Sequence, residues 1–234
     1  NIDALITLAS TATGRDYRNA GLTLAKMGLS AVPAQVPGIN GGLSTLQLEG
    51  VASTASSPGT LISGYQDNGT ALNTGGGSTW TGVLGGDGGP PAFARSGPSI
   101  AFQQYYGGTV QVSYQSGAPG SFYTVYAPMD GSSDVAPFYA ALVADPVTDG
   151  TAFSGWQHVW RSTDNGGALA QLQAADCGET GTGWAGCGDF QALGALPGGP
   201  SFGADRAGGT ISAIARTTAD AGTMWVATSM GRVL

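Results

Sequence analysis

Apolar and polar residues alternate in short runs along most of the chain, and the runs end at Gly, Pro, Asp or Asn. In residues 223–234 (TMWVATSMGRVL), Met224 and Val226 face one side of an extended chain, while Trp225 and Ala227 face the other. A period of two is typical of a strand that buries one face. Such short runs, separated by turn residues, predict β-hairpins.

Three segments repeat one pattern, in which an apolar strand is followed by a polar turn and a second apolar strand. They cover residues 48–69, 141–166 and 211–234, with turns that end at Gly59-Thr60, Gly150-Thr151 and Gly222-Thr223. A weaker member covers residues 96–113. Stacked four-stranded meanders of this size are the blades of a β-propeller. We therefore predict an all-β fold: a β-propeller of about four blades or part-blades, itself a fragment or part of a larger propeller. A β-sandwich is the alternative, since short alternating strands fit it too.

The repeats also predict how the chain is divided. Residues 43–234 are expected to form the propeller blades, and residues 1–42 an incomplete first blade or an N-terminal extension. At Leu234 the repeat pattern calls for one more outer strand. Because an unpaired strand edge is a liability for a free monomer, we expect a protein partner, or further copies of this chain in a larger assembly.

The composition supports strands and limits the chemistry. The chain has 234 residues, with 41 glycines, 12 prolines and a net charge of −7. Glutamate and lysine, which favour helices, are almost missing. Nothing resembles a basic stripe, so we expect no nucleic acid partner. No apolar run reaches the roughly 18 residues of a membrane span.

Cys177 and Cys187 enclose a glycine-rich stretch, CGETGTGWAGC. Two cysteines with no histidine near them in sequence do not make a tetrahedral zinc site without help. A disulfide is the simpler interpretation, and disulfides persist in oxidising compartments. We therefore expect a secreted protein, extracellular or periplasmic.

One turn resembles a known motif. The segment that begins at Ser162, STDNGGAL, is similar to the Asp box, S-x-D-x-G-x-T-W, with Asp164 and Gly166 at the expected offsets and Ala168 and Leu169 in place of Thr and Trp. The segments SGYQDNGT, TWTGVLGGDGG and CGDF are also similar to segments of glycine-rich secreted bacterial propellers. Over residues 43–234 the chain thus resembles the Asp-box (BNR-repeat) β-propellers of the sialidase and sortilin type.

This resemblance implies a structural role for Ser162, Asp164 and Gly166, as a turn at the outer edge of a blade. An aspartate in a turn accepts hydrogen bonds from backbone N–H groups without strand partners. Sialidase chemistry is not expected, because no Arg-Ile-Pro segment precedes the repeats and Glu49 and Glu179 are the only glutamates.

Glycine-rich loops carry the candidate binding residues. Asp67 and Asp87 are candidate catalytic carboxylates for a glycosidase, and an Asx-type turn is the alternative for each. With Asn68 they offer hard oxygen ligands that suit calcium, although no loop has EF-hand spacing. No other cofactor is expected. Tyr65 and Trp156 complete the candidate binding set.

The aromatic residues allow two interpretations. They could stack on sugars, or they could fill the space between blades; the residues concerned are Trp156, Trp160, Trp184, Trp225, Tyr105 and Tyr106. Our first hypothesis is a secreted, non-catalytic propeller that acts as a binding, assembly or structural module at the cell exterior, with a glycan as one candidate ligand. The alternative is a glycoside hydrolase or lyase of the Asp-box type that acts on a polysaccharide.

Overall fold

The computed structural model describes residues 46–179, 181, 184–194 and 208–234. The chain divides into two compact units, Asn1–Leu46 and Gln47–Leu234. The expectation for residues 1–42 therefore lies outside the described residues. Everything below concerns the second unit.

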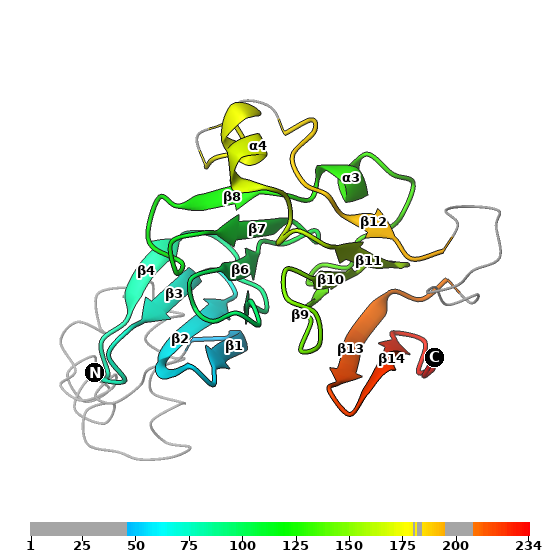
Figure 1. The fold of residues 1–234 in the computed structure, drawn as a ribbon, viewed down its shortest axis with the longest axis horizontal. Coiled ribbons are helices and arrows are strands. Elements are labelled where there is room, and N and C mark those ends of the chain that lie inside the picture. Colours follow the sequence, from blue (N-terminus) through cyan, green and yellow to red (C-terminus); the bar gives the residue numbers. More distant parts are fainter. Residues whose placement is uncertain (1–45, 180, 182–183, 195–207) are drawn as a thin grey trace, which may run out of the picture. The chain divides into compact units, whose positions relative to one another are not determined.

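The described chain is built from antiparallel meanders in which each strand pairs with the next (Figure 1). The first sheet consists of β1 (Leu48–Thr54), β2 (Ser57–Tyr65), β3 (Gly69–Asn73) and β4 (Thr81–Leu84). The second sheet consists of β5 (Ala92–Phe93), β6 (Ala101–Gln104), β7 (Val110–Ser113) and β8 (Phe122–Thr124). The third sheet consists of β9 (Ala141–Ala144), β10 (Ala152–Gly155), β11 (Val159–Ser162) and β12 (Gln191–Ala192). The fourth sheet pairs β13 (Ile211–Thr217) with β14 (Asp220–Thr228).

The repeats found in the sequence correspond to the strands. Residues 48–69 contain β1 and β2, residues 141–166 contain β9 to β11, and residues 211–234 contain β13 and β14. The prediction of an all-β propeller with about four blades or part-blades is confirmed, with three four-stranded sheets and one two-stranded sheet. The weak member, residues 96–113, is out of phase, because it contains the second and third strands of its sheet, β6 and β7.

Two short helices interrupt the β structure. The helix α3 (Ala127–Asp130) follows β8, and α4 (Leu169–Ala174) lies between β11 and β12. The sequence MDGS around Asp130 had been expected to form a tight turn with a positive φ. Instead Asp130 ends α3, and Gly131 follows with φ −72°. Proline at the start of α3 favours this outcome, because its fixed φ suits the first turn of a helix.

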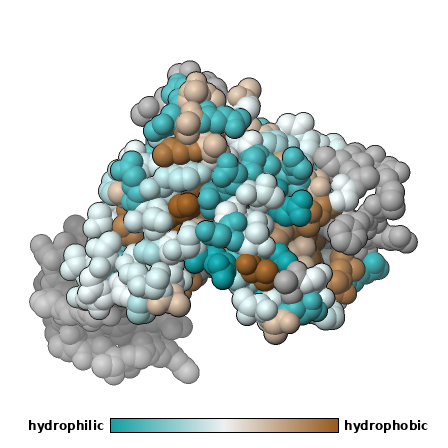
Figure 2. Space-filling view, in the orientation of Figure 1, coloured by the Kyte–Doolittle hydropathy of each residue, from teal (hydrophilic) through white to brown (hydrophobic). Residues whose placement is uncertain are grey.

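Apolar side chains lie between successive sheets, so each sheet buries its two faces against its neighbours. The largest cluster, between the second and third sheets, includes Phe102, Val112 and Trp160. A second cluster lies between the first and second sheets, and a third between the third and fourth. On the face drawn in Figure 2, apolar residues appear only in small separate patches among hydrophilic ones.

Gln104 links the second sheet to the chain that enters the third. Its side chain is fully buried, and Oε1 accepts the N–H of Ala140 at 2.7 Å while Nε2 donates to the carbonyl of Ala140 at 2.6 Å. The amide thus replaces a strand partner for Ala140. Leaving either backbone group unpaired at this depth would cost about 1–3 kcal/mol.

Candidate functional site

The turn between β2 and β3 contains Asp67, which has φ 61°. Its N–H donates to Oδ1 of Asp87 at 3.0 Å, and the N–H of Gly88 donates to the carbonyl of Tyr65 at 2.9 Å. The Asn68 amide donates to a backbone carbonyl inside the same turn. The structure therefore brings the predicted residues together, in contacts that join this turn to the loop between β4 and β5.

This arrangement limits the calcium hypothesis. Oδ1 of Asp87 already accepts a hydrogen bond, and the described residues contain no group of three or more His, Cys, Asp or Glu that could hold a metal ion. Calcium at Asp67, Asn68 and Asp87, and catalysis by the two aspartates, stay predictions.

Trp156 lies between the second and third sheets and is 3% exposed. It packs against Gly108, where a Cβ would lie 2.5 Å from Nε1 of the indole. Trp160 is buried in the same cluster, with ring centroids 6.5 Å apart. For these two tryptophans the structure supports packing between blades.

The turn that resembles an Asp box follows β11. Oγ of Ser162 is buried and accepts the N–H groups of Asp164 at 3.3 Å and Gly166 at 2.6 Å. The carboxylate that binds this turn belongs to Asp189, whose Oδ2 accepts the N–H groups of Thr163 and Asp164, each at 3.0 Å. Ser162 and Asp189 thus hold the turn, while Asp164 contributes its backbone N–H.

The predicted disulfide is confirmed. Cys177 and Cys187 are joined, with their Cα atoms 5.7 Å apart. Both ends of the enclosed loop are bound to the chain around β8, because Thr124 donates to the carbonyl of Cys177 at 2.7 Å and Ala127 donates to that of Cys187 at 3.2 Å. Among the described ranges, no helix is long and apolar enough to cross a membrane.

A pocket of about 570 Å³ lies over the second sheet. Its lining comes from four parts of the chain: the end of β4, the hairpin of β6 and β7, the stretch from β8 to α3, and the disulfide loop. This volume is in the usual range for sites that bind small molecules.

The floor of the pocket is polar. Gln103 on β6, Gln111 on β7 and Thr124 on β8 are cross-strand neighbours, so their side chains share one face of the sheet. Oε1 of Gln103 accepts the hydroxyl of Thr70 at 2.9 Å, and Nε2 of Gln103 donates to Oε1 of Gln111. Within the described structure, the amide nitrogen of Gln111 has no protein acceptor, so it can donate to a ligand.

Aromatic rings form the walls. Tyr105 and Tyr106 lie together with ring centroids 4.4 Å apart, and Tyr126 faces Trp184 at 6.2 Å with a tilt of 53°. Trp184 is 43% exposed. The two pairs thus offer apolar surfaces to a ligand that enters from solvent.

Glycine positions the first pair of rings. The turn between β6 and β7 contains Gly107 and Gly108 with φ 68° and 72°, a conformation that residues with a Cβ resist. Tyr105 packs directly on Gly86, where a Cβ would lie 2.4 Å from the tyrosine ring. The hairpin could not present these rings in this way with larger residues at the three positions.

Two exposed carboxylates complete the lining, Asp130 at the end of α3 and Glu179 in the disulfide loop. Oε1 of Glu179 accepts the N–H of Phe122 at 3.1 Å. Burial, and after it the charge of Asp130, raises the pKa of Tyr126, while a hydrogen bond with Thr109 lowers it. Among the described lining residues there is no lysine, arginine or histidine, so the ionised groups of the pocket are negative.

Sequence reasoning missed this pocket as a unit. It identified Tyr105, Tyr106 and Trp184 as aromatics able to stack on sugars, but it gave no role to Gln103, Gln111 or Asp130. The available signal was the hairpin sequence QQYYGGTVQ, which combines amides, a tyrosine pair and a two-glycine turn.

Solved structures similar to this chain support the propeller fold. An ancestral GH74 enzyme matches with a TM-score of 0.51 and 16% identity, over 77% of this chain and 22% of that chain. The GH74 xyloglucanase from Xanthomonas campestris has a TM-score of 0.48 and 16% identity, over 79% of this chain and 28% of that one. YCF48 from Cyanidioschyzon merolae has a TM-score of 0.40 and 14% identity, over 78% and 64%.

These likenesses concern the fold alone, because the identities are low and the chain spans only about a quarter of the GH74 structures. No protein-family model and no curated protein sequence matches the chain. The class that the fold defines is the β-propeller.

Proposed function

We propose that this chain is a secreted, non-catalytic β-propeller module that binds carbohydrate at the cell exterior. The pocket over the second sheet carries the proposal, because it combines a polar floor with aromatic walls. Sugars present both kinds of surface, with hydroxyl groups around the ring edge and apolar C–H groups on the ring faces. Amides such as Gln111 hydrogen-bond the former, and aromatic rings such as Trp184 pack against the latter.

Two further features support the setting. A disulfide between Cys177 and Cys187 fits an oxidising compartment. The turn at Ser162, Asp164 and Gly166 supports assignment to the Asp-box type of propeller, since Oγ of Ser162 accepts backbone N–H groups on the loop that leaves the third strand of its sheet.

One observation favours a second function. Asp130 and Glu179 line the same pocket, and glycoside hydrolases act with a pair of carboxylates that flank the scissile bond. Hydrolysis of the bound glycan is therefore the alternative. It assigns the chemistry to Asp130 and Glu179, rather than to Asp67 and Asp87.

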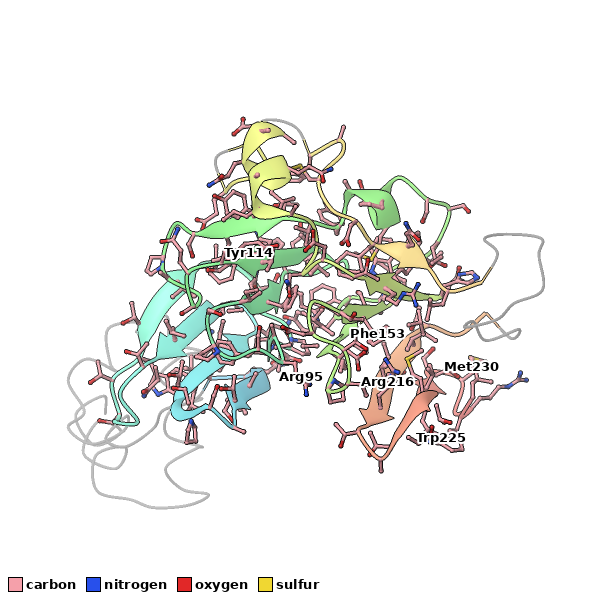
Figure 3. All side chains as sticks on the ribbon, in the orientation of Figure 1. Arg95, Tyr114, Phe153, Arg216, Trp225 and Met230 are labelled. Carbon is pink, nitrogen blue, oxygen red and sulfur yellow. A yellow bond between two sulfur atoms is a disulfide. The ribbon has the colours of Figure 1, made fainter. Side chains whose placement is uncertain are left out.

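The test is calorimetric titration of the protein with a panel of neutral oligosaccharides derived from β-glucans, mannans, xylans and galactans. We expect one class to bind, and Trp184→Ala to weaken that binding about tenfold through the loss of ring contact. Trp225→Ala is the matched control, because Trp225 is 59% exposed on β14 and does not line the pocket (Figure 3).

Each outcome bears on the choice of function. Equal losses in the two tryptophan variants, or no binding by any oligosaccharide, would contradict the proposal. New reducing ends in the incubated mixtures, abolished by Asp130→Asn or Glu179→Gln, would establish the hydrolase instead.

A further inference from the structure

We infer that the pocket over the second sheet selects glycans that carry protonated amino groups, such as oligomers of glucosamine, over neutral and acidic glycans. This inference rests on the proposed function, since it names the class of carbohydrate for the same pocket. It is carried by the juxtaposition of Asp130 and Glu179 with the rings of Tyr126 and Trp184.

The charges around the pocket have one sign. Asp130 and Glu179 are its ionised lining groups, and the described lining contains no cationic side chain that could pair with a carboxylate or sulfate on a sugar. The whole chain carries −7, so the long-range field also repels anions. Acidic glycans are therefore disfavoured at contact range and at a distance.

The rings add an attraction that is specific for cations. A positive charge within about 6 Å of an aromatic ring centroid is attracted to the ring face, most strongly for tryptophan. Tyr126 and Trp184 have centroids 6.2 Å apart, so an ammonium group between them lies within reach of both faces. The same rings can pack against the sugar that carries the ammonium group.

The two carboxylates are placed to hold such a ligand. The charge of Asp130 acts on the hydroxyl of Tyr126, which locates this carboxylate beside the aromatic wall. Glu179 lies five residues before Trp184 in the disulfide loop, and one of its oxygens is fixed by the N–H of Phe122. Its second oxygen makes no hydrogen bond within the described structure and is available to an ammonium group.

Both carboxylates are exposed, so each contributes modestly. Exposed ion pairs contribute about 0.2–1 kcal/mol, and a cation over an exposed ring about 0.5–1 kcal/mol. We therefore expect tetraglucosamine to bind about tenfold more tightly than tetra-N-acetylglucosamine at mildly acidic pH, where the free amines are protonated. Because the charges are exposed, this preference should shrink in high salt.

The experiment is calorimetric titration with these two tetramers and with a tetragalacturonate, using wild type and a variant with Asp130→Asn and Glu179→Gln. The amide oxygen of glutamine can still accept the N–H of Phe122, so the loop keeps its anchor. The control variant has Asp149→Asn and Asp220→Asn. It removes two exposed charges outside the pocket, where each carboxylate accepts one backbone N–H that an amide oxygen can also accept.

We expect the preference for tetraglucosamine to fall about tenfold in the pocket variant and to persist in the control variant. If neutral oligosaccharides bind, and the amine confers no advantage or the pocket variant keeps it, the inference is overturned while the proposed function stands. Equal losses in the two variants would show a general charge effect and also overturn it. If no oligosaccharide binds at all, both the proposed function and the inference fail.

Discussion

The turn after β11 depends on residues that reach it from elsewhere in the chain. Tyr114, which follows β7, donates its hydroxyl to the carbonyl of Gly167 at 2.5 Å (Figure 3). Asp189 accepts two backbone N–H groups of the same turn. Side chains distant in sequence thus connect this turn to the second sheet and to the segment before β12.

The surroundings of Tyr114 predict how stability changes with pH. Burial, followed by the charges of Asp164 and Asp189, raises the pKa of Tyr114 above its usual value of about 10. The folded state therefore favours the neutral hydroxyl. Its contribution to stability is complete below pH about 10, and it is lost as the pH rises through the raised pKa of the folded state.

We expect Tyr114→Phe to lower the free energy of unfolding by about 0.5–1.5 kcal/mol at neutral pH, because one hydrogen bond is lost. Above pH about 10 the difference should shrink, since the variant has no hydroxyl to ionise at this position. Urea unfolding at neutral and alkaline pH measures both effects. A wild type and a variant that lose stability in parallel above pH 10 would contradict this account.

At the scale of elements, the disulfide loop forms part of the pocket. Glu179 and Trp184 both lie between Cys177 and Cys187, and the two ends of the loop are bound to the stretch that carries Thr124 and Tyr126. The disulfide therefore positions one aromatic wall and one carboxylate together.

Replacing both cysteines by serine should lower the free energy of unfolding by about 2–3 kcal/mol, the range for so short a closed loop. We also expect glycan affinity to fall at least as far as in Trp184→Ala, because Trp184 and Glu179 lose their common constraint. Thermal unfolding and titration under folded conditions separate the two effects. A serine variant that is folded but binds as tightly as wild type would remove the disulfide from the site.

The elements also show what could be predicted from the sequence. The hairpin of β13 and β14 has nine-residue and seven-residue strands with clear alternation, and the sequence predicted it. By contrast, β5 and β12 have two residues each, too few to show any period. The pocket was not predictable as a unit, because cross-strand register places Gln103 beside Gln111, and tertiary contacts bring the disulfide loop to β8.

At the scale of the whole molecule, polar contacts connect each sheet to the next. Arg95, after β5, donates to the carbonyl of Pro146 at 3.0 Å, which connects the second sheet to the third. Arg216 of β13 binds the buried Asp145 at 2.5 Å and lies over the ring of Phe153 at 5.7 Å (Figure 3), which connects the third sheet to the fourth. Since each connection joins only neighbouring sheets, damage at one of them should stay local.

Arg216→Met tests this expectation. The change removes one partner of an ion pair whose carboxylate is fully buried, which costs about 3–5 kcal/mol. We expect hydrogen exchange to accelerate by about two to three orders of magnitude in β13 and β14, and to change little in the first sheet. Arg161→Met, at an exposed position on β11, is the control and should leave exchange unchanged.

The pattern of exchange distinguishes two ways of unfolding. Acceleration confined to β13, β14 and the facing strand β10 would show that the fourth sheet opens by itself, since its apolar cluster is shared with the third sheet alone. Equal acceleration in all four sheets would contradict this, and would make the second unit one cooperative body. In that case the pocket over the second sheet would be sensitive to substitutions in β13, and Arg216→Met would weaken glycan binding although it contacts no residue of the pocket.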